Sequence, residues 1–295
     1  MNKPKDEPGL QTILSHCGRN LEASGGYVNV PPYEGSTILH DDMEDLFGRV
    51  DNHLYGDGTA QTYGTDGGPT HEAFYDAMNK LEGGAGTWAF STGLAGCTIP
   101  MMAFLKTGDH MLVTDSVYGP TRQFCEVLLK NFGVEAEFYE PTIGAGIEKL
   151  IRPNTRLIYM ESPGTHTFEM QDVPAIAAVA RKYNIVTMID NTYATPLNFQ
   201  PLKHGVDVVV HSATKYICGH SDVLMSTVTC NEKNWKQVRD VCKMTGQYAS
   251  AQSVYLGLRG LRTLKVRLDA VGVHTRKVVD WLLKREEVKK VIWPA

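Results

Sequence analysis

The feature that most constrains the fold is a series of short apolar runs that alternate with helical stretches. Residues 206–210 contain four valines in five positions, which is typical of a strand buried on both faces of a parallel sheet. A helical stretch lies at 173–182. Further apolar runs lie at 134–139, 157–160, 185–190 and 223–230. This rhythm predicts an α/β fold, a doubly wound and mostly parallel sheet with helices on both faces, in which the last run returns antiparallel.

The valine run leads into small and hydroxylic residues and then into Lys215. In open α/β sheets ligands bind beyond the carboxyl ends of the strands, so Lys215 is expected at a ligand site. A lysine that is partly stripped of water there loses proton affinity and becomes an amine nucleophile, which can condense with a carbonyl cofactor. Considered alone, such a lysine would be interpreted as a surface residue.

A second strand, at 185–190, ends in Asp190. Two parallel strands that end near Asp190 and Lys215 would place an acid and an amine at the same edge of the sheet. Pyridoxal phosphate needs that pair, because a lysine binds its aldehyde and an aspartate keeps its ring nitrogen protonated. Asp190 alone would be interpreted as a helix cap or turn residue, so the pair is the specific signal.

The stretch from Leu81 to Ala95 is expected to hold the cofactor phosphate. It has the pattern of a helix end, a turn, a short strand, Gly93 and a new helix. Gly93 lets the backbone approach an anion closely, and the helix start at Leu94 offers free N–H groups. Ser212 and Thr214 are candidates for additional hydroxyl donors.

The segment 84–89 also fits the dinucleotide pattern G-x-G-x-x-A. Its last residues have the pattern of a strand, whereas the dinucleotide fingerprint requires a helix there. The dinucleotide interpretation is therefore rejected.

The segment Ser212 to Tyr216, SATKY, together with Gly219 to Asp222, GHSD, resembles the lysine signature of the cysteine/methionine-metabolism pyridoxal-phosphate enzymes. The resemblance extends over nearly all 295 residues. It implies an aspartate-aminotransferase-like large domain (fold type I) and a smaller C-terminal domain. Within the family, the β-acting lyases are the most similar at 161–164, 172–176 and 257–264. The γ-acting relatives usually carry other residues where Gly164 stands.

The resemblance assigns roles to two tyrosines. Tyr118 is expected against the face of the pyridine ring, where it holds the ring and relays protons; without the family, a tyrosine packed beside Pro120 is an equally good interpretation. Tyr63 is implied to reach into a partner subunit's site and contact the cofactor phosphate. Two residues later the family usually has an arginine for that phosphate, and this chain has Thr65. A threonine gives no charge-assisted pair, which predicts weaker cofactor retention.

Three parts are expected along the chain: an extended N-terminal arm at 1–60 with one short helix near 41–46, a large pyridoxal-phosphate-binding domain at 61–256, and a C-terminal part at 257–295. The first has little sustained periodicity and many glycines and prolines. By resemblance the arm wraps a neighbouring subunit, which implies a homodimer or homotetramer.

The C-terminal part carries a helical apolar stripe that predicts one long helix from 258 to 283. Residues 288–293 are expected to start the first strand of the small domain, of which the resemblance implies that most is missing. The arginine that grips the substrate carboxylate in the family is expected in that missing part. The sequence contexts of Arg259, Arg262 and Arg267 do not match it.

Composition excludes several classes of protein. A formal net charge of −4 gives no reason to expect nucleic acid or anionic membrane as a partner. The six cysteines are scattered without paired spacing, which argues against a metal site or disulfide framework and favours reduced thiols in the cytoplasm. The charged start at 1–8 has no following apolar run, so no signal peptide is expected.

The expected function is that of a carbon–sulfur β-lyase that acts on a small sulfur amino acid such as L-cystathionine. The reaction of L-cystathionine with water would give homocysteine, pyruvate and ammonia. Lys215 is the expected base at the substrate Cα, followed in importance by Asp190 and Tyr118. Two alternatives stay open. One is a γ-acting relative, namely a synthase, a γ-lyase or a sulfhydrylase. The other is a truncated, non-catalytic remnant.

Overall fold

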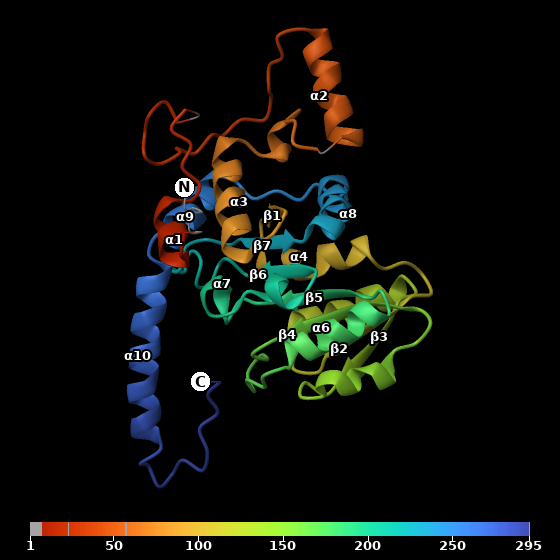
Figure 1. The fold of residues 1–295 in the computed structure, drawn as a ribbon, viewed down its shortest axis with the longest axis vertical. Coiled ribbons are helices and arrows are strands. Elements are labelled where there is room, and N and C mark those ends of the chain that lie inside the picture. The colour runs from red at the N-terminus through yellow and green to blue at the C-terminus, as the bar shows by residue number, and fades with distance from the viewer. Residues whose placement is uncertain (1–7, 23, 57, 295) are drawn as a thin grey trace, which may run out of the picture.

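A single seven-stranded sheet forms the centre of the computed structural model, which describes residues 8–22, 24–56 and 58–294. Residues 1–7 lie outside the described residues. They belong to the charged start of the chain, for which no signal peptide is expected. The strand order is β1-β7-β6-β5-β4-β2-β3 (Figure 1). The strands are β1 (Gly86–Phe90), β2 (His110–Thr114), β3 (Glu135–Tyr139), β4 (Thr155–Glu161), β5 (Val186–Asp190), β6 (Val208–His211) and β7 (Ser226–Cys230).

The sheet is parallel except at β7, which pairs antiparallel with both β1 and β6. This confirms the mostly parallel sheet and the returning strand. The returning strand begins at Ser226, later than expected from the apolar run. The reason is that the backbone of Met225 bonds to the turn after β6: Thr214 N–H donates to Met225 O at 3.0 Å, and Met225 N–H donates to Thr214 Oγ1 at 3.0 Å.

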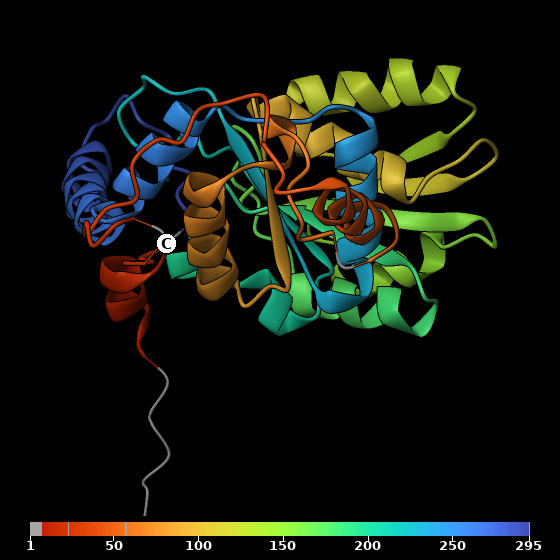
Figure 2. The same cartoon turned by 90° about the horizontal axis from the view of Figure 1, so that it is seen from above.

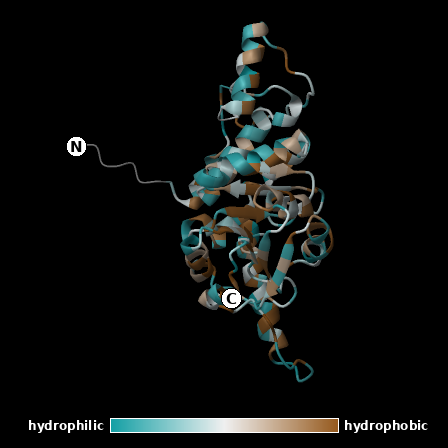
Figure 3. Ribbon diagram, turned by 90° about the vertical axis from the view of Figure 1, so that its right-hand side faces the viewer, coloured by the Kyte–Doolittle hydropathy of each residue, from teal (hydrophilic) through white to brown (hydrophobic). Residues whose placement is uncertain are grey.

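Helices cover both faces of the sheet (Figure 2). They are α1 (Leu10–His16), α2 (Met43–Tyr55), α3 (Pro69–Glu82), α4 (Gly93–Thr98), α5 (Gly119–Gln123), α6 (Val173–Lys182), α7 (Thr195–Asn198), α8 (Glu232–Met244), α9 (Ala251–Leu261) and α10 (Leu264–Leu282). Side chains of α6 pack with those of β4, β5 and β6 in one core cluster, and side chains of α8 join a second cluster with β1 and β7. Hydrophobic residues accordingly concentrate in the middle of the molecule (Figure 3).

Helix α3 starts at Pro69, a residue that suits the first turn of a helix, and it buries Phe74, Met78 and Leu81 completely. It ends at Gly83, which adopts the left-handed conformation with φ of 75° that a side chain would disfavour. The short strand β1 and helix α4 follow in the predicted order.

The N-terminal arm contains more helix than expected. Helix α1 was not anticipated, because its seven residues carry too short an apolar pattern to be recognised. It is fixed by a distant residue: the Arg262 guanidinium donates to Leu14 O and to Cys17 O, both at 2.7 Å. Helix α2 extends to Tyr55, well beyond the predicted short helix, and Asp42 caps its start. All of α2 is described, and it buries none of its residues.

The single long helix expected from 258 to 283 is wrong. The chain forms α9 and α10, which are separated by a turn in which Thr263 N–H donates to Gly260 O at 3.1 Å. The Arg267 guanidinium holds the break by donating to Gly260 O at 2.9 Å and to Tyr216 O at 2.7 Å. The tertiary bonds to the chain after β6 therefore override the helical periodicity.

The strand expected at 288–293 is also absent from the described residues, which are irregular beyond α10. Every strand in the described residues belongs to the one sheet, so this segment has no strand to pair with, and a lone strand leaves its backbone groups unpaired. Trp293 instead lies under the Arg276 guanidinium of α10, with 4.7 Å from Cζ to the ring centre. No helix among the described residues is both long and apolar enough to cross a membrane.

The break between α9 and α10 makes Gly260 sensitive to substitution. A Cβ at Gly260 would lie 2.2 Å from Ile217 O and 2.8 Å from Cys218 O. We expect Gly260→Ala to lower the free energy of unfolding by about 1–3 kcal/mol, as overpacking does.

Helix α10 offers a matched control, because a Cβ at Gly272 meets nothing within 4 Å. Gly272→Ala should raise the free energy of unfolding by about 0.5–1 kcal/mol through helix propensity. Urea unfolding of both variants gives the comparison, and equal effects of the two substitutions would contradict the close packing at Gly260.

Candidate active site

A cavity of about 530 Å³ lies at the carboxyl ends of β4, β5 and β6. All but one of the residues predicted from the sequence line it. They are Lys215, Asp190, Tyr118, Gly93, Leu94, Ser212 and Thr214. The exception is Tyr63, which is half exposed and pairs through a β-bridge with Thr37 of the same chain.

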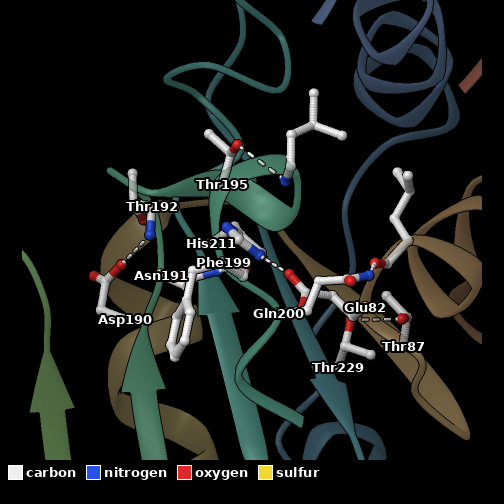
Figure 4. A network of polar contacts seen from close by, with 12 residues as sticks. Glu82, Thr87, Asp190, Asn191, Thr192, Thr195, Phe199, Gln200, His211 and Thr229 are labelled. Carbon is white, nitrogen blue, oxygen red and sulfur yellow. Dashed lines mark hydrogen bonds and ion pairs between the residues drawn. The ribbon is translucent and has the colours of Figure 1, made fainter. Parts of the chain in front are cut away.

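The pairing of β5 with β6 brings the acid and the amine to one edge. Asp190 is in register with Val210, and Asn191 N–H donates to Val210 O at 2.8 Å. Beyond the strands, Ser212 N–H donates to Thr192 Oγ1 at 2.7 Å. Thr192 N–H in turn donates to Asp190 Oδ1 at 2.9 Å, which orients the carboxylate (Figure 4).

Lys215 is exposed at the wall of this cavity, which corrects the expectation that it is partly stripped of water. The tight turn that carries it, closed by a bond from Lys215 N–H to Ser212 O at 3.0 Å, projects past the end of β6. Desolvation of the amine therefore has to come from whatever fills the cavity, because the described residues leave Lys215 open to solvent.

Asp190 is buried, at 8% exposure, and has acidic and thiol neighbours. The Cys97 thiol donates to Asp190 Oδ2 at 3.5 Å, and burial together with the Asp190 charge raises the pKa of that thiol well above its ordinary value. Glu161 ends β4 directly beside Asp190 in the register. Burial and, to a lesser extent, the charge of Asp190 raise the pKa of Glu161 to about 8. Glu161 is therefore mostly protonated at neutral pH, so Asp190 has no second ionised carboxylate beside it at this edge of the sheet.

The turn into α4 has a geometry that suits an anion, and its role as the phosphate site stays a prediction. Gly93 passes so close to Ser212 that a Cβ would lie 2.6 Å from Ser212 Oγ. Thr92 caps the helix by accepting a bond from Ala95 N–H at 3.2 Å, and the first turn of a helix leaves its other N–H groups, here those at Gly93 and Leu94, without intrahelical acceptors. These groups and the Ser212 hydroxyl form a small donor set suited to an anion.

Thr214 differs from Ser212 in its bonding. Its hydroxyl donates to Met225 O at 3.1 Å and accepts from Met225 N–H, so its proton is already used within the fold. The role of Thr214 as a phosphate donor stays a prediction.

A buried hydrogen bond between two side chains, which the sequence did not indicate, lies near the cavity. His211 Nε2–H donates to Glu82 Oε1 at 2.5 Å, and both side chains are almost fully inaccessible (Figure 4). His211 ends β6 and Glu82 ends α3, so the pair joins the strand that precedes Lys215 to the helix that packs beneath it. Neither residue has a local signal, because the partners are 129 positions apart.

The residues present fit pyridoxal phosphate. The cavity supplies an amine at Lys215, a buried carboxylate at Asp190 for the ring nitrogen, and an anion cradle around Gly93 that has no room for a side chain. Together with the seven-stranded sheet, these features define a fold type I pyridoxal-phosphate site.

Comparison with known proteins agrees with this class. The sequence profile of the family "Cys/Met metabolism PLP-dependent enzyme" matches residues 11–295. A protein from Rhizobium johnstonii is 45% identical over 287 residues, which are 97% of this chain and 70% of the relative. The cystathionine β-lyase of Haemophilus influenzae is 39% identical over 288 residues, 97% of this chain and 72% of that enzyme.

The crystal structure of cystathionine γ-lyase from Lactobacillus plantarum, complexed with L-serine, superposes with a TM-score of 0.89 at 30% identity, covering 97% of this chain and 72% of that one. The chain therefore belongs to the cysteine/methionine-metabolism family of pyridoxal-phosphate-dependent enzymes.

The cradle yields a test on cofactor affinity. We expect Gly93→Ala to raise the pyridoxal phosphate dissociation constant by about tenfold, the effect of one lost hydrogen bond, because the new methyl group displaces the Ser212 hydroxyl. Ser212→Ala should give a similar loss, since it removes that donor directly. Equilibrium dialysis measures both, with Gly272→Ala as the control that keeps the wild-type constant. An unchanged constant in both cradle variants would place the phosphate elsewhere.

Proposed function

We propose that this protein is a carbon–sulfur β-lyase that converts L-cystathionine and water into homocysteine, pyruvate and ammonia. The observation that carries the proposal is the shared cavity of Lys215 and Asp190 at one sheet edge. The similarity to the cystathionine β-lyase of Haemophilus influenzae supports the choice of substrate.

In this proposal the residues divide the work. When bound, pyridoxal phosphate supplies an electron sink for the negative charge that develops at the substrate Cα. Asp190 holds the proton at the ring nitrogen, and Tyr118 covers the ring face. Lys215 would hold the cofactor at its aldehyde, and the free Lys215 amine would serve as the base for the Cα proton. A thiol then leaves from Cβ.

Gly164 favours the β-lyase over a γ-acting relative such as the Lactobacillus plantarum enzyme. A Cβ at Gly164 would lie 2.3 Å from Ser116 Oγ, so the loop beside the cavity excludes any larger residue unless it moves. The residues usual in γ-acting relatives would therefore give the cavity a different wall.

The second candidate is a non-catalytic protein. It is favoured by the positions of three arginines that could otherwise bind a substrate carboxylate. Arg259, Arg262 and Arg267 do not line the cavity. The guanidinium groups of Arg262 and Arg267 donate hydrogen bonds to backbone carbonyls, so neither group is placed to bind a substrate carboxylate.

We also propose a homodimer or homotetramer in the cytoplasm. The arm exposes Leu39 at 90%, Tyr55 at 80% and Phe47 at 60%, an apolar surface suited to a second copy. Tyr63 follows the arm, pairs with its Thr37 through a β-bridge, and lies outside the cavity of its own chain, which fits a contact with the cofactor phosphate of that copy. The six cysteines are buried free thiols, which suits a reducing compartment.

Incubation of the purified chain with pyridoxal phosphate and L-cystathionine tests the activity. We expect steady pyruvate release, with a loss of at least about 10³-fold in Lys215→Ala, because the general base and the cofactor anchor are both removed. Release of α-ketobutyrate instead of pyruvate would indicate the γ-acting chemistry. Absence of both products would favour the non-catalytic candidate.

Thr65 offers a gain-of-function test of the proposed phosphate contact. Thr65 is exposed, so an arginine fits without repacking. We expect Thr65→Arg to lower the pyridoxal phosphate dissociation constant by about tenfold or more, the value of one charge-assisted hydrogen bond. Thr65→Val is the matched control and should not tighten binding. An unchanged constant in Thr65→Arg would contradict the phosphate role of this position.

A further inference from the structure

Glu161 is the buried acid of the cavity that the proposed mechanism does not use. It is the last residue of β4, lies at 8% exposure, and lines the cavity beside Asp190. Burying a carboxyl group next to another one is costly, so a neutral residue would serve better if the position only filled space. The contacts of its two oxygens show what the carboxyl group does.

Each oxygen of Glu161 binds a different part of the cavity wall. Oε2 accepts from Tyr118 N–H at 2.8 Å, at the N-cap of α5. Oε1 accepts from the Thr165 hydroxyl of the neighbouring loop. One carboxyl group therefore connects the Tyr118 turn with the loop 163–169.

The loop needs this support because its backbone is held in unusual conformations. His166 and Phe168 have φ of 65° and 58°, in the left-handed region that disfavours side chains. Phe168 faces Tyr193 edge-on, with 5.3 Å between ring centres, and both rings line the cavity. The loop also bonds to the Tyr118 turn directly, since Thr165 N–H donates to Ser116 O at 2.8 Å.

The charges around Glu161 favour its neutral form. Asp190 faces it from β5, Cys97 from α4 and Tyr159 from β4 itself, while Lys215 lines the same cavity. Burial, and then Asp190, raise the pKa of Glu161 to about 8. A protonated Glu161 still accepts from Tyr118 N–H through Oε2 and keeps its bond to the Thr165 hydroxyl through Oε1, in which the carboxyl group is then the donor.

We propose that Glu161 is a positioning residue that fixes Tyr118 and the loop 163–169 in one arrangement around the ring-binding face of the cavity. Its contacts reach no reacting atom, so it acts through Tyr118 and Thr165. The inference rests on the cofactor site of the proposed function but requires no particular substrate. Cofactor binding and its spectrum therefore test it even if the chain releases no pyruvate.

The test compares Glu161→Gln with Glu161→Ala. A carboxamide keeps an acceptor for Tyr118 N–H and a donor for Thr165, whereas alanine removes both. The readouts at pH 7 are the pyridoxal phosphate dissociation constant and the visible circular dichroism of the bound cofactor, which reports how the ring is held. We expect Glu161→Gln to keep both near wild type. Glu161→Ala should weaken binding by about tenfold or more and reduce the dichroic band.

Thr165 provides a second variant in case Glu161→Ala fails to fold. Thr165→Val removes the hydroxyl and should reduce the dichroic band, while Thr165→Ser should restore it. Thr167→Val is the matched control, because the Thr167 hydroxyl bonds only to Thr165 O within the loop, at 3.2 Å, and not to Glu161. A folded Glu161→Ala or Thr165→Val with wild-type dichroism and affinity would overturn the proposal.

The pH dependence of stability checks the neutral form of Glu161. Because its pKa in the folded protein, about 8, lies above the ordinary value, ionisation destabilises the fold. The free energy of unfolding of the wild type should therefore fall relative to Glu161→Gln as pH rises from about 5 to 8, and the difference should become constant above that. A constant difference from pH 5 upward would show that Glu161 is ionised throughout and would overturn the assignment of its proton.

Discussion

The site depends first on the register in which β5 pairs with β6. That register sets Asp190 beside Val210 and lets Thr192 bond to Ser212, so the acid and the turn that bears Lys215 leave the sheet at the same level. A slip of one residue would turn every side chain of one strand to the opposite face. Asp190 would then point away from the cavity. Apolar residues of both strands pack into core clusters on the two sides of the sheet, and this packing holds the register in place.

The second constraint is the control of charge beneath the cavity. Two further buried acids lie near the strand ends, on different elements. Glu82 is hydrogen-bonded to His211, and the pKa of Glu161 is raised to about 8. Asp190 receives its bonds from the backbone of Thr192 and from the Cys97 thiol. Asp190 is thus the buried carboxyl group left for the role proposed at the ring nitrogen.

The sequence predicted what depends on local pattern. The parallel strands, the antiparallel return and the helix that begins at Gly93 all follow from short-range periodicity or turn chemistry, and they are confirmed. The same pattern indicated Asp190 and Lys215, because both follow directly from strand ends.

What the sequence missed depends on contacts between distant residues. Arg267 breaks the expected long helix through bonds to residues about fifty positions earlier, and Arg262 fixes α1 from the other end of the chain. Glu161 ends a strand, but its role follows only from the hydrogen bonds that its two oxygens form with Tyr118 and Thr165. The exposure of Lys215 likewise depends on how far its turn projects from the sheet. The hydrophobic periodicity of the sequence gives no information on these long-range contacts.

We infer that Lys215 is the amine that holds the cofactor at the edge shared with Asp190. The most direct measurement is to reduce the protein–pyridoxal phosphate adduct with borohydride, digest it, and locate the modified lysine by mass spectrometry. We expect a stoichiometric pyridoxyl group on Lys215. Modification spread over other lysines, with Lys215 unlabelled, would contradict it.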